Sequence, residues 1–247
     1  MTLVLMAFFR QEFYSLEMRD DLTDVVGVAA LADPLRRRLY RYVARSAEPV
    51  GREEAAAAVE VPVHTAKFHL DRMVDDGLLT VEFRRLSGRS GPGAGRPAKL
   101  YRRSEHEFTV SLPERRYDLL GEVLADAAAA SMAQRVPIDE VTGPVARAHG
   151  EEFAREHTVA DGGPLERLAD VLEQGGFEPR VDAERMVLEN CPFDRLAQDH
   201  TALVCGLNLD FVEGVIDGIG CTEVDATLDP SPGRCCVSAR LRKADRS

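Results

Sequence analysis

The segment that most constrains this chain spans residues 61–78. Its apolar residues recur at i, i+4 and i+7, as Ala66, Leu70 and Met73. This spacing predicts a helix with one buried stripe and with polar and basic side chains on its open side. An Ala-rich helical run, Glu53–Val59, precedes it, and Pro62 is tolerated at a helix start, so only a tight turn separates the two. Two short helices joined in this way are typical of a helix-turn-helix.

A basic hairpin is expected next. Gly77 ends the second helix, Leu78–Phe83 is apolar and β-branched enough for a strand, and Leu100–Arg103 returns as a second strand. The loop between them is rich in Gly and Pro and carries arginines, so the hairpin forms a wing. Ahead of the pair, Asp33 caps and Pro34 opens a supporting helix.

The charge of the chain is unevenly distributed. The formal net charge is −11, yet residues 33–104 carry 15 lysines and arginines against 9 aspartates and glutamates, whereas residues 105–247 carry 14 against 28. A basic module in an acidic protein leaves one face attractive to phosphate while limiting non-specific binding. The basic part coincides with the expected winged helix-turn-helix, which favours DNA as the partner over a winged helix used for protein contacts.

Four segments are predicted, in an α+β chain. Residues 1–23 form an N-terminal extension, either disordered or a mis-assigned start ahead of Met18, and 24–112 form the winged helix-turn-helix domain. A strand is expected at Phe108–Leu112. Residues 113–160 form a long connecting helix that opens at Pro113 and a further helical segment at Val145–His157, which either link the domains or pair with their copies in a homodimer. Residues 161–247 form an α+β effector domain with an antiparallel sheet, containing all five cysteines. One of its helices is expected at Leu209–Ile219, with Asn208 as the cap.

The sequence also bounds location and class. No apolar run approaches the roughly 20 residues needed to span a bilayer, and residues 1–17 lack the features of a secretory signal, so a cytoplasmic protein with reduced cysteines is expected. There is no P-loop, no His-Glu-x-x-His, no Gly-x-Ser-x-Gly and no dinucleotide-binding glycine pattern. We therefore expect no enzyme.

The predicted DNA contacts follow from the winged unit. A helix starting at Val63 presents its early turns to a major groove, and the wing follows the backbone, where Arg96 could enter a minor groove. Phe68 either touches a thymine methyl group or packs in the core, and we favour the core. The predicted contact residues are His64, Thr65, Lys67, His69, Arg72, Arg84, Arg85, Arg89, Arg96 and Lys99.

The cysteines are candidate metal ligands. Cys191 precedes a proline at a helix N-terminus, which favours the thiolate, and Cys205 and Cys221 are expected on loops that converge. Cys235 and Cys236 are expected on a strand, pointing to opposite faces, so one of them joins the site. The predicted ligands are Cys191, Cys205, Cys235 and Cys221. Four thiolates suit an iron–sulfur cluster or zinc, and the alternative is that the thiols are core residues.

Two resemblances add to these expectations. Asp33–Arg36, His69–Met73 with Gly77-Leu78, and Gly95–Arg102 resemble the winged helix of ArsR-type bacterial transcription regulators. The Cys-x-Cys metal site of that family's arsenic and cadmium sensors is absent, because Gly51–Ala56 contains no thiol.

Asn190–Phe193, Val204–Asn208 and Pro232–Val237 are similar to the effector domain of SufR-type repressors, although the cysteine spacing departs from that family's by a residue or two. That resemblance implies a four-iron four-sulfur ([4Fe-4S]) cluster and repression of cluster-assembly genes. The expected partner is double-stranded DNA carrying an inverted repeat, bound by a homodimer. The alternative is a regulator that binds a small organic molecule, with structural cysteines.

Overall fold

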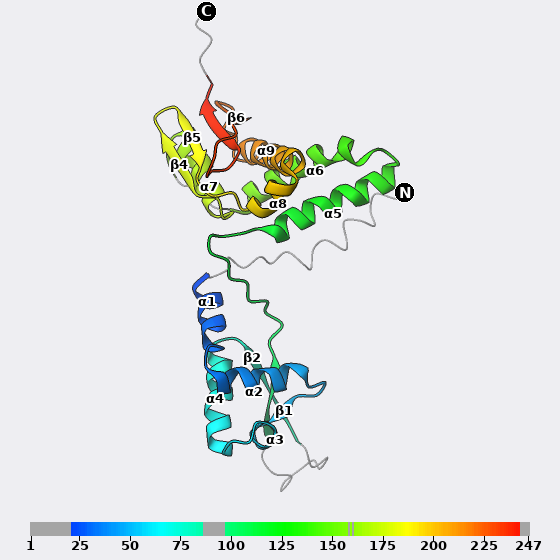
Figure 1. Cartoon of the computed structure of the whole chain (residues 1–247), viewed down its shortest axis with the longest axis vertical. Coiled ribbons are helices and arrows are strands. Elements are labelled where there is room, and N and C mark those ends of the chain that lie inside the picture. Colours follow the sequence, from blue (N-terminus) through cyan, green and yellow to red (C-terminus); the bar gives the residue numbers. More distant parts are fainter. Residues whose placement is uncertain (1–20, 86–96, 158, 160, 243–247) are drawn as a thin grey trace, which may run out of the picture. The chain divides into compact units, whose positions relative to one another are not determined.

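The structure is a computed structural model that describes residues 21–85, 97–157, 159 and 161–242. The chain divides into two compact units, Met1–Val110 and Ser111–Ser247 (Figure 1). Each unit contains helices and an antiparallel sheet, in agreement with the predicted α+β class. Among the described helices, none combines the length and apolar character that crossing a membrane requires.

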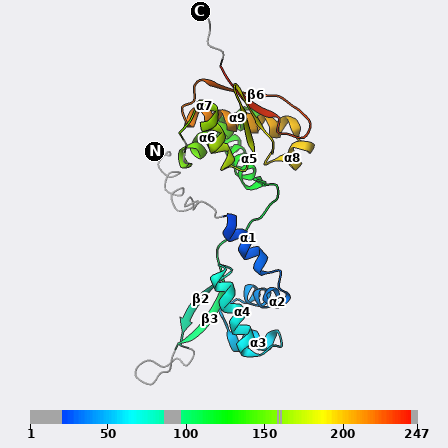
Figure 2. The same cartoon turned by 90° about the vertical axis from the view of Figure 1, so that its left-hand side faces the viewer.

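The first unit is built of helices around a small sheet (Figure 2). Its strands pair antiparallel in the order β1-β3-β2, with Val81 and Val50 both opposite Tyr101. The elements are α1 (Asp21–Ala30), α2 (Pro34–Arg45), β1 (Val50–Gly51), α3 (Arg52–Ala58), α4 (Val63–Asp75), β2 (Leu79–Arg84) and β3 (Ala98–Arg103).

Local signals place these helices where the sequence predicted them. The Asp33 carboxylate accepts hydrogen bonds from the amides of Leu35 and Arg36, which caps α2. Gly77 adopts a positive φ of 76° directly after α4, a conformation that glycine reaches without a Cβ clash. The core gathers Leu39, Val43, Leu70, Met73 and Tyr101, all buried. The predicted helix-turn-helix is confirmed.

The strand predicted at Phe108–Leu112 is wrong, because no residue from 104 to 116 belongs to a strand. Side chains hold this segment instead. The Thr109 amide donates to Asp24 at 2.9 Å, and His106 Nε2 lies 2.8 Å from the same carboxylate. The Phe108 ring packs over Gly27 of α1. Hydrogen bonding to α1 therefore replaces a sheet partner.

The second unit packs five helices and a four-stranded sheet around one core. The strand order is β4-β5-β7-β6, all antiparallel, with Met186 opposite Ala239 in the central pair. The elements are α5 (Tyr117–Gln134), α6 (Ile138–Glu156), α7 (Pro164–Glu173), β4 (Pro179–Asp182), β5 (Arg185–Leu188), α8 (Asp194–Asp199), α9 (Thr201–Gly218), β6 (Val224–Leu228) and β7 (Val237–Leu241).

The long helices expected to form a separate segment at 113–160 belong to this core. Helices α6 and α9 cross so closely that a Cβ at Gly150 would collide with the Phe211 carbonyl and one at Gly214 with the Arg147 carbonyl. The Arg147 side chain also pairs with Asp217 of α9 at 2.6 Å. Helices α5 and α6 are thus packed into the second unit.

Several helix boundaries differ from the predicted ones. Helix α5 begins at Tyr117 rather than at the predicted Pro113, and α6 begins at Ile138 rather than Val145, with Pro144 inside it. Helix α9 begins at Thr201, whereas the sequence predicted a start after a cap at Asn208. Asn208 is instead 2 % exposed in the middle of the helix.

Candidate nucleic-acid interface and thiol cluster

The open side of α4 carries the predicted DNA-contacting side chains. His64, Lys67 and Arg72 are exposed, and Thr65 and His69 are half-buried. Because Ala66, Leu70 and Met73 occupy the inward stripe, the other side chains face solvent. The structure therefore leaves the expected recognition surface of α4 accessible.

The prediction that Phe68 lies in the core is wrong. Its side chain is 66 % exposed, because the position two residues after Ala66 lies across the helix from the buried stripe. The ring contacts the edge of His69, at 5.3 Å between ring centroids. An exposed aromatic side chain among polar residues is suited to apolar contact with a thymine methyl group.

Asp71 connects α4 to the wing. Its carboxylate accepts hydrogen bonds from Lys67 Nζ at 2.8 Å, from Lys99 Nζ at 2.6 Å and from the Tyr101 hydroxyl at 2.7 Å. Burial alone would raise the pKa of Asp71, but these three donors outweigh it and hold the pKa well below its usual range. The carboxylate thus fixes two lysines of the predicted interface beside each other.

A second carboxylate holds the other end of α4. Asp76 is 8 % exposed, and it pairs with Arg72 at 3.3 Å and with Arg36 of α2 at 3.8 Å. Asp76 therefore links Arg72 of the predicted interface to Arg36 of α2. The ring atom Nδ1 of His69 is buried and has no hydrogen-bond partner within the described part of the chain.

The predicted wing contacts differ from one another in their surroundings. Arg84 pairs with Glu82 at 2.8 Å and with Glu48 at 3.2 Å, so its charge is largely balanced on the sheet. Arg85 is exposed. Arg89 and Arg96 lie outside the described residues.

Four of the five cysteines lie together in the second unit, and we call Cys191, Cys205, Cys235 and Cys236 the thiol cluster. All are free thiols. The Cys191 side chain interacts with that of Cys235, and Cys205 interacts with Cys236, so the cluster consists of two neighbouring pairs. Asn208 Nδ2 of α9 donates to Cys235 Sγ at 3.1 Å.

The cluster differs from the predicted ligand set at two positions. Cys221 has other neighbours: its Sγ donates to the Pro164 carbonyl at 3.6 Å. Cys236 takes part because β7 begins only at Val237, so the alternation of side chains along a strand does not separate it from Cys235. Cys205 lies within α9 rather than on the predicted loop.

The environment sets the thiols apart electrostatically. The hydrogen bond from Cys235 lowers the pKa of Cys191, and the same bond together with burial raises that of Cys235. Burial, followed by the bond to Cys236, raises the pKa of Cys205 to about 12. Of Cys191, Cys205 and Cys235, Cys191 is thus the thiol whose pKa is lowered, and the sequence placed it at a helix N-terminus.

Two polar side chains hold the loop that carries Cys191. Arg115 Nη1 donates to the Cys191 carbonyl at 3.1 Å and also bonds to the Asn190 side chain. Asn190 Nδ2 donates to the carbonyls of Gly176 at 2.9 Å and Glu114 at 3.0 Å. The loop position is therefore fixed from the chain before α5 and from the turn after α7. The sequence offered no signal for Arg115 in this role.

No group of three or more His, Cys, Asp or Glu side chains in residues 21–85, 97–157, 159 and 161–242 is arranged to hold a single metal ion. In the described residues the thiols thus form two pairs, and they do not converge on a single position that a metal ion could occupy. Their number and type nonetheless match the four thiolates that a [4Fe-4S] cluster takes, one for each iron.

Comparison with known proteins defines the first unit further. Residues 31–82 match the model of a helix-turn-helix domain. The match spans α2, α3, α4 and most of β2, and it supports a DNA-binding regulator.

The chain matches no curated protein. A solved structure, human N-acetylserotonin methyltransferase in complex with SAM, is 24 % identical with a TM-score of 0.23, over 53 % of this chain and 39 % of that chain. No conclusion about fold or activity follows from that similarity.

Proposed function

We propose that this protein is a transcriptional repressor that binds DNA through its first unit and senses a [4Fe-4S] cluster through the thiol cluster of its second unit. The observation that carries the proposal is the gathering of four free cysteines from distant parts of a chain that also contains a helix-turn-helix domain. A helix-turn-helix domain alone would bind DNA without responding to a cluster, and the four cysteines alone would bind a cluster without acting on DNA.

The DNA-binding half of the proposal rests on the exposed surface of α4. His64, Lys67 and Phe68 offer a hydrogen-bonding ring, a cation and an apolar ring on consecutive turns. These groups can reach base edges, thymine methyl groups and flanking phosphates in a major groove. One such helix per chain reads one half-site, so we propose a homodimer that binds an inverted repeat with half-sites about one helical turn apart.

The sensing half rests on the donor set. Cys191, Cys205, Cys235 and Cys236 would hold the cluster, and Cys221 would not. When bound, the cluster supplies a redox-active centre held by thiolates. Among this chain's own residues, Arg115 and Asn190 fix the loop of Cys191, and Asn208 directs its amide at Cys235.

The alternative of a small organic effector finds little room in one cavity of the second unit. This cavity is lined by apolar side chains and Asn208 and has a volume of about 10 Å³. A cavity of this size accommodates roughly one water molecule. An organic effector bound in this cavity would therefore have to displace packed side chains.

Two measurements test the proposal. Purified protein incubated anaerobically with iron and sulfide should develop the broad visible absorption of a thiolate-ligated cluster; protein that stays colourless would leave the small-molecule alternative. Affinity for DNA fragments selected from genomic DNA should fall on the order of 1,000-fold between 50 and 200 mM salt, as for about six phosphate contacts. A flat salt response would exclude the DNA-binding role.

The dimer is tested separately. Sedimentation at micromolar concentration should give a dimer, and footprinting should protect two half-sites. A monomer protecting a single half-site would contradict the symmetric arrangement.

A further inference from the structure

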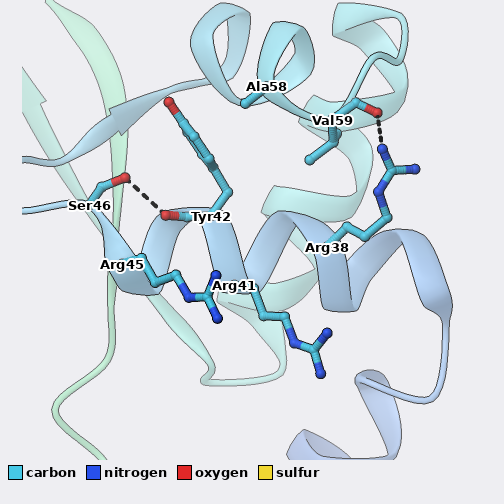
Figure 3. Close-up of a pocket in the computed structure, with 7 residues that line it drawn as sticks. All are labelled: Arg38, Arg41, Tyr42, Arg45, Ser46, Ala58 and Val59. Carbon is cyan, nitrogen blue, oxygen red and sulfur yellow. Dashed lines mark hydrogen bonds between the residues drawn. The ribbon is translucent and has the colours of Figure 1, made fainter.

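A hollow lined by arginines lies between α2 and α3 of the first unit (Figure 3). Its volume is about 420 Å³, and it is open to solvent. Arg38, Arg41 and Arg45 follow one another along α2 at spacings of three and four residues, so they share one face of that helix. The remaining lining residues are Tyr42, Ser46, Ala58 and Val59. We call this hollow the arginine groove.

The three arginines differ in their partners. Arg38 extends toward α3 and donates to the Val59 carbonyl at 2.6 Å, at the C-terminal end of that helix (Figure 3). Arg38 therefore offsets the partial negative charge at the carbonyl end of α3, which would otherwise repel an anion here. Arg41 and Arg45 are both exposed.

Arg41 and Arg45 have no acidic partner within the described part of the chain. The carboxylates nearest in sequence are engaged elsewhere: Glu48 with Arg84 at 3.2 Å, and Glu54 with the Tyr42 hydroxyl at 3.0 Å. Like charges four residues apart on a helix repel each other. An anion placed between the two guanidinium groups would relieve that repulsion, and nothing in the described fold provides one.

The lining selects the chemistry of that anion. Guanidinium groups present planar forks of donors that match phosphate oxygens. The Ser46 hydroxyl on the same wall is engaged, because it donates to the Tyr42 carbonyl at 2.9 Å (Figure 3). The side chains of Tyr42, Ala58 and Val59 add an apolar part to the lining. The adjacent guanidinium groups of Arg41 and Arg45 are the feature that favours a phosphate group.

We propose that the arginine groove is a phosphate-binding site, distinct from the surface of α4. The phosphate comes either from the DNA backbone or from a free phosphorylated small molecule. In the first case the inference rests on the proposed function; in the second it is independent of it.

The test uses the full chain and the double variant R41Q/R45Q. Both side chains are exposed and the Arg38–Val59 bond is retained, so the fold should be preserved, which circular dichroism verifies. The matched control is R37Q, which removes an exposed arginine of the same helix that does not line the groove.

The first arm titrates inorganic pyrophosphate by calorimetry without DNA. Saturable binding by the parent and by R37Q, weakened roughly tenfold or more in R41Q/R45Q, supports the site. The second arm measures the salt dependence of DNA affinity, where loss of one or two phosphate contacts lowers the slope of log K against log salt by about 0.9 each. A lower slope in the double variant alone assigns the phosphate to DNA; equal slopes with groove-dependent pyrophosphate binding assign it to a free ligand.

The inference is overturned when both arms fail. In the first arm, pyrophosphate binding is absent or equal in the double variant and the parent; in the second arm, the two proteins give equal salt slopes. If no variant binds DNA at all, the proposed function fails, while the pyrophosphate arm still decides whether the groove binds phosphate.

Discussion

The Asp71 carboxylate of α4 and the Lys99 ammonium of β3 form an ion pair at 2.6 Å. The pair joins the helix expected to enter a major groove to a strand of the wing. Because Lys67 binds the same carboxylate, two predicted phosphate or base contacts are positioned by a residue that need not touch DNA itself. Asp71 also offsets part of their charge, which restrains non-specific attraction to phosphate.

Replacing Asp71 by Asn should therefore loosen specificity rather than abolish DNA binding. We expect affinity for unrelated DNA to rise and the preference for the operator to fall by roughly tenfold, since a displaced base contact costs about 1–3 kcal/mol. Competition binding with operator and unrelated duplexes measures both. Asp75→Asn is the matched control, because Asp75 lies on the same helix and is exposed. Equal preference in the parent and D71N would show that Asp71 does not position the contacts.

The lowered pKa of Asp71 predicts how pH affects the first unit. A carboxyl whose pKa is lower in the folded state stabilises the fold above its unfolded pKa, about 3.9, and loses that contribution as pH falls toward the folded value. Hydrogen exchange of the α4 and β3 amides in the full chain should thus become faster, relative to the intrinsic rate, as pH falls below about 4. In D71N this dependence should shrink, and an unchanged pH profile would contradict the assignment.

Helix α4 could be predicted from the sequence because its position is determined by residues close to one another in the chain. The stripe of Ala66, Leu70 and Met73 and the stop at Gly77 are local signals, and they placed α4 to within about a residue. The aromatic character of Phe68 favours the core, but its position on the helix does not. It falls opposite the buried stripe, so its side chain is exposed.

The errors in the second unit have long-range causes. Asn208 resembles a helix cap, yet α9 begins at Thr201 and Asn208 lies inside it, where its amide bonds to a thiol 27 residues away. A regular strand that included both Cys235 and Cys236 would point their side chains to opposite faces, whereas β7 begins only at Val237. Which thiols meet depends on how the β5–α8 loop, α9 and β7 pack, and spacing alone does not encode that packing.

The crossing of α6 and α9 gives a direct test of the second unit. Gly214→Ala should destabilise this unit by about 1–3 kcal/mol, because the added Cβ would meet the Arg147 carbonyl of α6. Gly206→Ala in the same helix is the control: its Cβ meets nothing within 4 Å, so it should be neutral or stabilising by up to about 1 kcal/mol. Urea unfolding followed by circular dichroism compares the two. Equal stability would show that the helices do not cross as described.

The central claim is that the thiol cluster controls DNA affinity, and operator binding with and without iron and sulfide tests it most directly. Under anaerobic conditions, the affinity of the parent should differ between the loaded and chelator-stripped forms by roughly 5- to 150-fold, the range of a coupling of about 1–3 kcal/mol. Serine at Cys191, Cys205, Cys235 or Cys236 should remove both the visible absorption and the difference in affinity, whereas Cys221→Ser should retain both. If loaded and stripped parent protein bind the operator equally, or if Cys221→Ser behaves like the other four variants, the account is contradicted.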